Sequence, residues 1–207
     1  MKIFLTQASV FVILLLFTLS TKAQNRDYVI TANGDTLACT ITFPAFVQYG
    51  KYKTASMDKP KQILMGEIKE LYLSKHNILI REVYKHPGKK WSAQFMTVLE
   101  NGRINLYEEA INYTHMDAGG GMYTSSSNKW YVSKGSDTLK VIKNSDYSMS
   151  ALFFKSKKSR KNDFVEMIMD NKAVYDKYLA DDKFSFEQIR ALVHLYNTGE
   201  LPKDQPK

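Results

Sequence analysis

One histidine and one aspartate stand beside the most unusual stretch of this sequence. His115 and Asp117 lie two residues apart, just before three consecutive glycines and a run of serines. On an extended chain both side chains face the same side, which suits a general base and the group that orients it, or two ligands of a divalent metal. A metal site needs three or four protein ligands, and the neighbouring sequence supplies no others, so no metal is expected.

The glycines and serines favour a simpler interpretation of the same stretch. Three glycines do not favour a strand, and serines add no apolar burial, so 115–128 is predicted to be a mobile surface loop. The alternative is an enzyme, a secreted hydrolase, whose site includes His115 and Asp117.

Positive charge is concentrated in the seven residues from 155 to 161. The five basic residues are Lys155, Lys157, Lys158, Arg160 and Lys161. Positive charge just before a helix is disfavoured by the helix dipole, so we hypothesise that the segment binds an anionic envelope component, a lipid head group or a phosphorylated glycan. The alternative is a solvated loop that keeps a basic protein soluble. Nucleic acid is not an expected partner, because no recognition fold is visible.

The remaining residues capable of chemistry stand alone. Cys39 is the only cysteine, so no internal disulfide can form. It lies in 37–43, where apolar residues alternate, and this pattern predicts a core position on a strand. His76 and His86 fall in predicted turns, and His194 on the polar side of a predicted helix. Because no specific catalytic motif occurs, the sequence favours a non-enzymatic binding or interaction module without a cofactor.

The first residues have the order of a secretory signal peptide. Lys2 supplies positive charge, 8–19 is an apolar run, and Ala23 ends a pattern of small residues typical of a cleavage site. The run is shorter than the roughly 20 apolar residues that a membrane span needs. We therefore expect cleavage after Ala23, a periplasmic or secreted protein, and no transmembrane span in the mature chain.

Composition and length predict one folded domain after the signal peptide. The chain has 207 residues, 44% of them hydrophobic and 24% charged, with a net charge of +8. These values exclude disordered, collagen-like and disulfide-framework proteins. We expect a single α+β domain over 24–202, β-rich in 24–143 and mainly helical in 144–202. Residues 203–207 are expected to be a disordered tail.

Alternating apolar residues and turn signals predict strands in the first part and helices in the second. Three hairpins are expected, turning at 33–35, at 101–102 and at 134–137, with Trp91 on the apolar face of the second. Helices are expected from a cap at Asn162, over 174–179, and from a cap at Ser185 to about Tyr196. The predicted architecture is an antiparallel β-sheet or partly open barrel covered by two or three C-terminal helices.

Several short motifs carry a family resemblance. They are 28–31 with Gly34-Asp35-Thr36-Leu37, Leu106-Tyr107, Trp130-Tyr131-Val132, and Leu195-Tyr196-Asn197. With its signal peptide and helical C-terminus, the sequence resembles a loose group of small, mostly uncharacterised exported proteins of Bacteroidota. The resemblance implies an envelope location and assigns no reaction and no functional residues.

Overall fold

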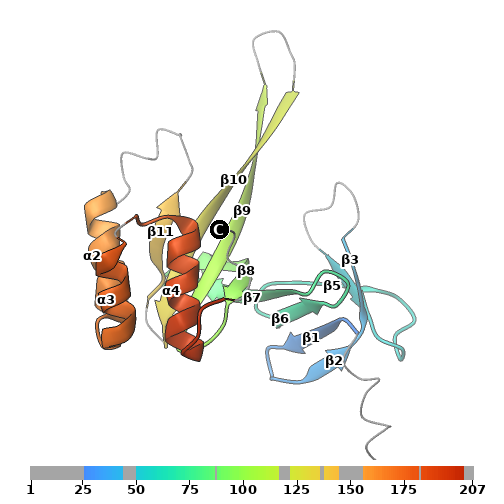
Figure 1. Cartoon of the computed structure of the whole chain (residues 1–207). Helices are drawn as coiled ribbons and strands as arrows, with labels where there is room; N and C mark the ends of the chain where they lie inside the picture. Colours follow the sequence, from blue (N-terminus) through green and yellow to red (C-terminus); the bar gives the residue numbers. More distant parts are fainter. Residues whose placement is uncertain are drawn as a thin grey trace, which may run out of the picture. The chain divides into compact units, whose positions relative to one another are not determined.

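The structure is a computed structural model that describes residues 26–43, 50–86, 88–116, 122–135, 138–144, 156–181 and 183–202. The chain divides into two compact units, which meet in the sequence between Ile78 and Leu79. The earlier residues are called unit 1 below, and the later ones unit 2. Figure 1 shows the strands of both units and the three helices of unit 2.

Unit 1 consists of short antiparallel strands. In one group the strand order is β6–β1–β2, and in the other it is β3–β4–β5. The tight turn between β1 and β2 includes Gly34, whose φ of +93° is a conformation that glycine adopts readily. The strands are β1 (Tyr28–Thr31), β2 (Thr36–Ala38), β3 (Thr40–Thr42), β4 (Lys51–Lys53), β5 (Lys61–Gln62) and β6 (Ile68–Leu73).

The predicted first hairpin is present, but its second strand is divided at Cys39. Residues 36–38 pair with β1, whereas 40–42 pair with β4. The expectation of one apolar face over 37–43 is therefore wrong in part: Ile41 is buried, whereas Phe43 is 56% exposed. At the division, the Cys39 N–H donates to the Asp27 carbonyl and extends the β1–β2 pairing by one residue, and the Ile41 N–H donates to the Asp27 carboxylate.

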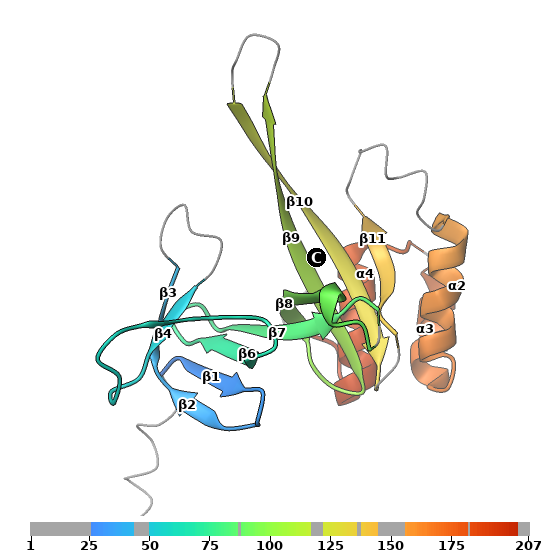
Figure 2. The same ribbon diagram turned by 180° about the vertical axis from the view of Figure 1, so that it is seen from behind.

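Unit 2 is an open antiparallel sheet with helices on one face. Its strand order is β11–β10–β9–β8–β7. The strands are β7 (Ile78–Tyr84, which begins at the boundary), β8 (Ala93–Glu100), β9 (Ile104–Met116), β10 (Met122–Lys134) and β11 (Lys140–Asn144). A short 3₁₀ turn, Lys90–Ser92, precedes β8, and the helices are α2 (Lys157–Ile168), α3 (Lys172–Ala180) and α4 (Phe186–Thr198). Figures 1 and 2, which are opposite views, agree that α4 lies against one face of β9 and β10.

The predicted loop over 115–128 is largely a hairpin. β9 extends to Met116 and β10 begins at Met122, so the serines of 125–127 pair with 111–113. The prediction was wrong for these residues because it weighed side-chain burial, whereas the backbone hydrogen bonds of a long antiparallel ladder need none. Only 117–121 of the stretch lies outside the described residues.

The main core lies between the sheet and the helices of unit 2. Alternate residues of β9 and β10, among them Leu106 and Val132, face Phe164 of α2 and Leu192 of α4. Fully buried side chains on both layers give this core most of its apolar burial, at roughly 25 cal/mol for each Å² of apolar surface removed from water. The fold of unit 2 therefore depends on the contact of helices with one sheet face.

The predicted cap is correct for α4 and wrong for α2. α4 begins as predicted, because the Ser185 hydroxyl accepts from the Gln188 N–H, and it ends at Gly199 with φ of +80°. The cap of α2 lies six residues before the predicted cap at Asn162, because the Ser156 hydroxyl accepts from the Ser159 N–H. Four of the five basic residues, which were expected to precede the helix, lie inside it instead: Lys157, Lys158, Arg160 and Lys161.

The end of α4 is attached to the sheet by one amide. The Asn197 side chain accepts from the Ile104 N–H at 3.0 Å and donates to the Ile104 carbonyl at 2.7 Å. The contact requires Gly102, because a Cβ there would lie 2.4 Å from the carboxamide carbon of Asn197. The tyrosine–asparagine pair of the resemblance motif is thus a structural attachment in this chain.

The predicted fold class is confirmed. Antiparallel sheets that do not close into a barrel are followed by three helices, which is an α+β protein. No helix in the described part of the chain is long and apolar enough to cross a membrane. The prediction of a single domain over 24–202, with a signal peptide before it and a disordered tail after it, stays a prediction.

Candidate functional site

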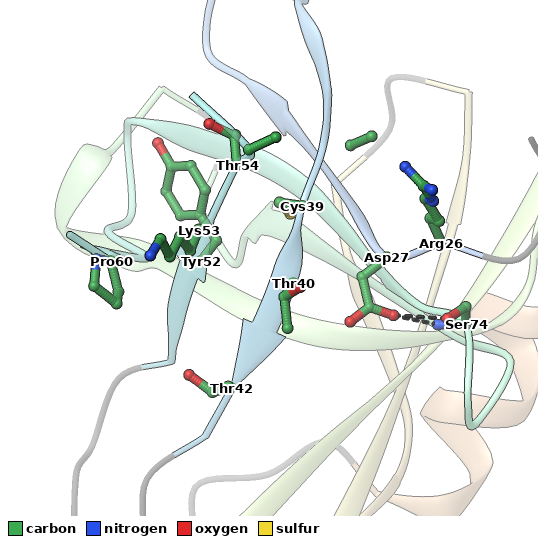
Figure 3. A pocket seen from close by; sticks show the side chains of 12 residues that line it. Arg26, Asp27, Cys39, Thr40, Thr42, Tyr52, Lys53, Thr54, Pro60 and Ser74 are labelled. Carbon is green, nitrogen blue, oxygen red and sulfur yellow. Dashed lines mark hydrogen bonds between the residues drawn. The ribbon is translucent and has the colours of Figure 1, made fainter. Parts of the chain in front are cut away.

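Unit 1 contains a pocket of about 650 Å³. Its wall combines two cationic side chains with several hydroxyl groups (Figure 3). Thr40 and Lys53 are directly paired on β3 and β4, so their side chains share the exposed face of this pair. The lining residues are Arg26, Asp27, Ala38, Cys39, Thr40, Thr42, Tyr52, Lys53, Thr54, Ala55, Pro60 and Ser74.

The Asp27 carboxylate of the pocket is held by hydrogen bonds within unit 1. One oxygen accepts from the N–H and the hydroxyl of Ser74 at 2.9 and 2.8 Å, and the other accepts from the Ile41 N–H at 3.2 Å. Burial alone raises the pKa of Asp27, but these hydrogen bonds and the charge of His76 outweigh it, so the pKa lies below its usual range. The carboxylate is therefore ionised near neutral pH and connects three segments of unit 1.

Cys39 lies in the same pocket wall as a neutral thiol. Burial, followed by the negative charge of Asp27, raises its pKa to about 11. At pH 7 only about one thiol in ten thousand is then ionised, and the thiolate is the reactive form. The pocket therefore offers cations and hydroxyl groups and no activated thiol.

The predicted pair His115 and Asp117 lies at the end of the long hairpin. The backbone of His115 belongs to β9 and pairs with Tyr123. Asp117 and the side chain of His115 lie outside the described residues.

The predicted cationic segment is distributed around the start of α2. Lys157 and Lys158 are exposed in its first turn. Arg160 donates from Nε to the Ile142 carbonyl at 3.0 Å, and Lys161 lies over the Phe184 ring at 6.0 Å, so both stabilise the packing of α2. Lys155 lies outside the described residues.

Of the three histidines predicted to stand alone, two have specific partners. His194 lies 2.9 Å from a Glu100 carboxylate oxygen through Nδ1, and the other oxygen of Glu100 accepts from Arg190. The His86 ring lies beside the Trp91 ring, with centroids 5.3 Å apart and the two planes tilted by 40°. Trp91 itself is 76% exposed, so its predicted place on the apolar sheet face is wrong: it belongs to the 3₁₀ turn before β8.

A buried carboxylate on the helix-free face of the unit 2 sheet escaped sequence analysis. Glu109, only 4% exposed, accepts from Lys85, Gln94 and Tyr131. The Lys85 ammonium also lies over the Tyr131 ring at 5.6 Å. These residues come from four separate strands or strand ends, so no local spacing could have indicated the network. All three partners donate to Glu109, which makes the network a stabilising connection across the sheet.

A second charged cluster joins α4 to the start of β9 and the end of β10. Tyr196 and Lys134 both donate to the Asp170 carboxylate. The bond from Lys134 is the main reason that the pKa of Asp170 lies below its usual range. Lys134 and Arg103 also lie over the Tyr196 ring, at 5.1 and 5.3 Å from its centroid. These contacts hold α4 against the end of β10, in addition to the contact of Asn197 with Ile104.

Within the described residues, no three histidine, cysteine or acidic side chains are placed to hold a metal ion. No family model, curated protein or solved structure matches this chain.

Proposed function

We propose that the protein is an exported, non-enzymatic binding module of the periplasm or cell envelope, and that its ligand site is the pocket of unit 1. The observation that carries the proposal is the composition of the pocket wall. Two exposed cations, Arg26 and Lys53, flank a hollow of about 650 Å³ that also displays threonine hydroxyls. Pockets that hold small molecules usually measure about 300–1,000 Å³.

The chemistry of the wall indicates the class of ligand. Guanidinium and ammonium groups only donate hydrogen bonds, and they suit carboxylate or phosphate oxygens. The hydroxyls of Thr40, Thr42 and Thr54 both donate and accept, as sugar hydroxyls do. A small acidic saccharide, such as a uronate or a sugar phosphate, satisfies both kinds of group.

The ionisable groups of the pocket support binding rather than covalent catalysis. The Asp27 carboxylate is engaged by Ser74 and Ile41, and the raised pKa of Cys39 keeps its thiol protonated. A nucleophile would need a deprotonated thiol, or a hydroxyl beside a strong enough base. The Ser74 hydroxyl donates to Asp27, but the lowered pKa of that carboxyl makes it a poor base for removing a hydroxyl proton. The pocket is thus suited to hold an anion without attacking it.

Calorimetric titration with glucuronate, glucose 6-phosphate and glucose tests the pocket. We expect the two acidic ligands to bind and glucose to bind at least tenfold more weakly, because a charge-assisted hydrogen bond contributes about 1.5–3 kcal/mol. Arg26→Gln/Lys53→Gln is expected to weaken acidic ligands by tenfold or more. Lys69→Gln, an exposed lysine of unit 1 outside the pocket, is the matched control. Equal binding of glucose, no binding of either acid, or an unchanged double variant would contradict the proposal.

The basic segment 155–161 is a second proposed anion-binding surface. Two observations support it: Lys157 and Lys158 are exposed, and they stand at a helix start whose free N–H groups also favour negative charge. The partner would be the anionic envelope component expected from the sequence, a phosphorylated glycan or a lipid head group. Retention on such a glycan should fall when all five basic residues become glutamine.

Export is tested by the N-terminus of the protein recovered from cells. We expect the chain to begin at Gln24, because Ala23 supplies the small residue that signal peptidase requires. Ala23→Leu should leave the leader attached. Recovery of the unaltered chain with Met1 in place would refute cleavage.

A further inference from the structure

The loop between β7 and β8 carries the most exposed aromatic residue among the described large hydrophobic side chains. Trp91 is 76% exposed, and Tyr84, at the end of β7, is 36% exposed. An indole in water is unfavourable because it leaves a large apolar surface hydrated. Singly exposed hydrophobic residues are common, so the surroundings of Trp91 decide whether it has a role.

The backbone of this loop is well fixed. The Ser92 hydroxyl is buried, accepts from the His86 N–H at 3.0 Å and lies 2.7 Å from the Lys89 carbonyl. Backbone bonds from Lys85 to Ser92, from Lys89 to His86 and from Ser92 to Lys89 close the loop. The ring of His86 supports one side of the indole. Trp91 is therefore held outward by a preorganised loop, which lowers the entropy cost of any contact it makes.

The loop is cationic as well as aromatic. Lys89 and Lys90, the two residues before Trp91, are exposed, and His86 adds a third basic group when protonated. The sequence contains no aspartate or glutamate between Glu82 and Glu100. The third lysine of the loop, Lys85, is neutralised by Glu109. Lys89 and Lys90 thus give the tip a positive charge that a negative partner would complement.

The chemistry of the tip favours a membrane surface over a saccharide. Ammonium and indole N–H groups donate hydrogen bonds and accept none, so they match phosphate oxygens, whereas neutral sugar hydroxyls require acceptors too. A free phosphorylated glycan would satisfy the lysines but offer no apolar environment for the indole. The interface of an anionic bilayer supplies both, and tryptophan is enriched at that depth.

We infer that the Trp91 loop, residues 88–92, docks on a bilayer containing anionic phospholipids, with the indole at head-group depth and Lys89 and Lys90 beside lipid phosphates. Each lysine near such a surface contributes about 1 kcal/mol, which is roughly fivefold in partitioning. We expect weak, reversible binding to the membrane, because one indole and two lysines bury little apolar surface. Salt should weaken it further, because it screens the attraction between the lysines and the lipid phosphates. The inference does not depend on a ligand in the pocket of unit 1.

Tryptophan fluorescence tests the contact directly, because the protein has two tryptophans and only Trp91 is exposed. The protein recovered from cells is mixed with vesicles of phosphatidylcholine alone or with 40% phosphatidylglycerol, on the order of the anionic fraction that attracts polybasic segments. We expect a blue shift and quenching by acyl-brominated lipid with anionic vesicles only. Trp91→Phe should lose both signals and bind on the order of tenfold more weakly. Trp130, stacked on Phe186, should not respond.

Charge variants locate the surface that binds. Lys89→Gln/Lys90→Gln should weaken partitioning by roughly 25-fold, the product of two fivefold effects. Lys172→Gln/Lys177→Gln, which removes equal charge from exposed positions of α3, should change it less than twofold. Circular dichroism should report the same folded state for every variant. An equal loss of binding in the α3 control would overturn the inference, and so would a loss with Lys157→Gln/Lys158→Gln in place of the loop variant. Vesicle binding without quenching of Trp91 would also overturn it. Binding to a phosphorylated polysaccharide and not to vesicles would overturn it as well.

Discussion

Asp27 in unit 1 and Glu109 in unit 2 are carboxylates that connect separate strands in different ways. Asp27 is half-buried and accepts from two backbone N–H groups and one hydroxyl. Glu109 is almost completely buried and accepts from three side chains, one of them a lysine. The Asp27 contact depends mainly on backbone N–H groups, with one serine hydroxyl, whereas the Glu109 contact depends on the side chains of three partners from separate strands or strand ends. In unit 1 the carboxylate therefore holds three chain segments together mainly through their backbone, whereas in unit 2 it connects side chains of neighbouring strands within one sheet.

The largest expected effect follows from removing the buried carboxylate of unit 2. Glu109→Ala should lower the free energy of unfolding by about 3–5 kcal/mol, because it leaves Lys85 without its partner and the polar atoms of Gln94 and Tyr131 unpaired. Urea unfolding followed by circular dichroism measures the change. Glu200→Ala, at an exposed position, should cost less than about 0.5 kcal/mol. A cost below about 1 kcal/mol for Glu109→Ala would mean that the network adds little to stability.

Asn197 of unit 2 separates the effect of charge from that of backbone contact. Its neutral carboxamide binds the backbone of Ile104, as the charged carboxylate of Asp27 binds backbone N–H groups. Asn197→Ala should cost about 2 kcal/mol by leaving the N–H and carbonyl of Ile104 unpaired. Gly102→Ala should cost about 1–3 kcal/mol, because its Cβ would overlap the Asn197 carboxamide. The double variant should cost at least about 1 kcal/mol less than the sum, since the overlap no longer exists. If the two changes in the free energy of unfolding simply add, residue 102 and the Asn197 side chain are not in contact.

The smallest expected effect, and the one that depends on pH, belongs to Asp27. At pH 7, Asp27→Asn should destabilise unit 1 by about 1.5 kcal/mol, because an amide NH₂ would face an N–H donor. The folded-state pKa of Asp27 is lowered, so its contribution is present above the unfolded value near 4 and is lost as the pH falls through the folded pKa. Hydrogen exchange of 36–43 and 68–74 should therefore distinguish the variant from wild type at pH 7, and less so near pH 3. A difference that grows in acid would contradict this sign.

Local signals in the sequence were enough for most elements. The Asn-Gly turns, the Ser185 cap and Gly199 predicted hairpins and a helix that the structure contains. Fold class followed from the same signals, because strands with one apolar face and one-sided helices must cover each other. The register that places serines 125–127 opposite 111–113 did not follow, since no local residue fixes it.

The sites were harder to predict than the elements. Asp27 meets Ser74 across 47 positions in the sequence, and Glu109 meets Tyr131 across 22. Each of these residues is ordinary in its own neighbourhood, and only strand pairing brings the partners together. Trp91 was misplaced for a related reason: the alternation of 91–99 extends one step beyond the strand, and the Ser92 hydrogen bonds turn the chain before it. Spacing identifies a face, whereas the end of an element is decided by particular hydrogen bonds.

The solitary thiol of unit 1 has a practical consequence. Both tryptophans belong to unit 2, so intrinsic emission follows the opening of that unit, whereas alkylation of Cys39 follows the opening of the other. A sulfhydryl with a pKa of about 11 reacts slowly until its surroundings disperse and its acidity returns to normal. Timing the maleimide reaction of Cys39 against the change in tryptophan emission would therefore reveal which unit opens first, without any substitution in the chain.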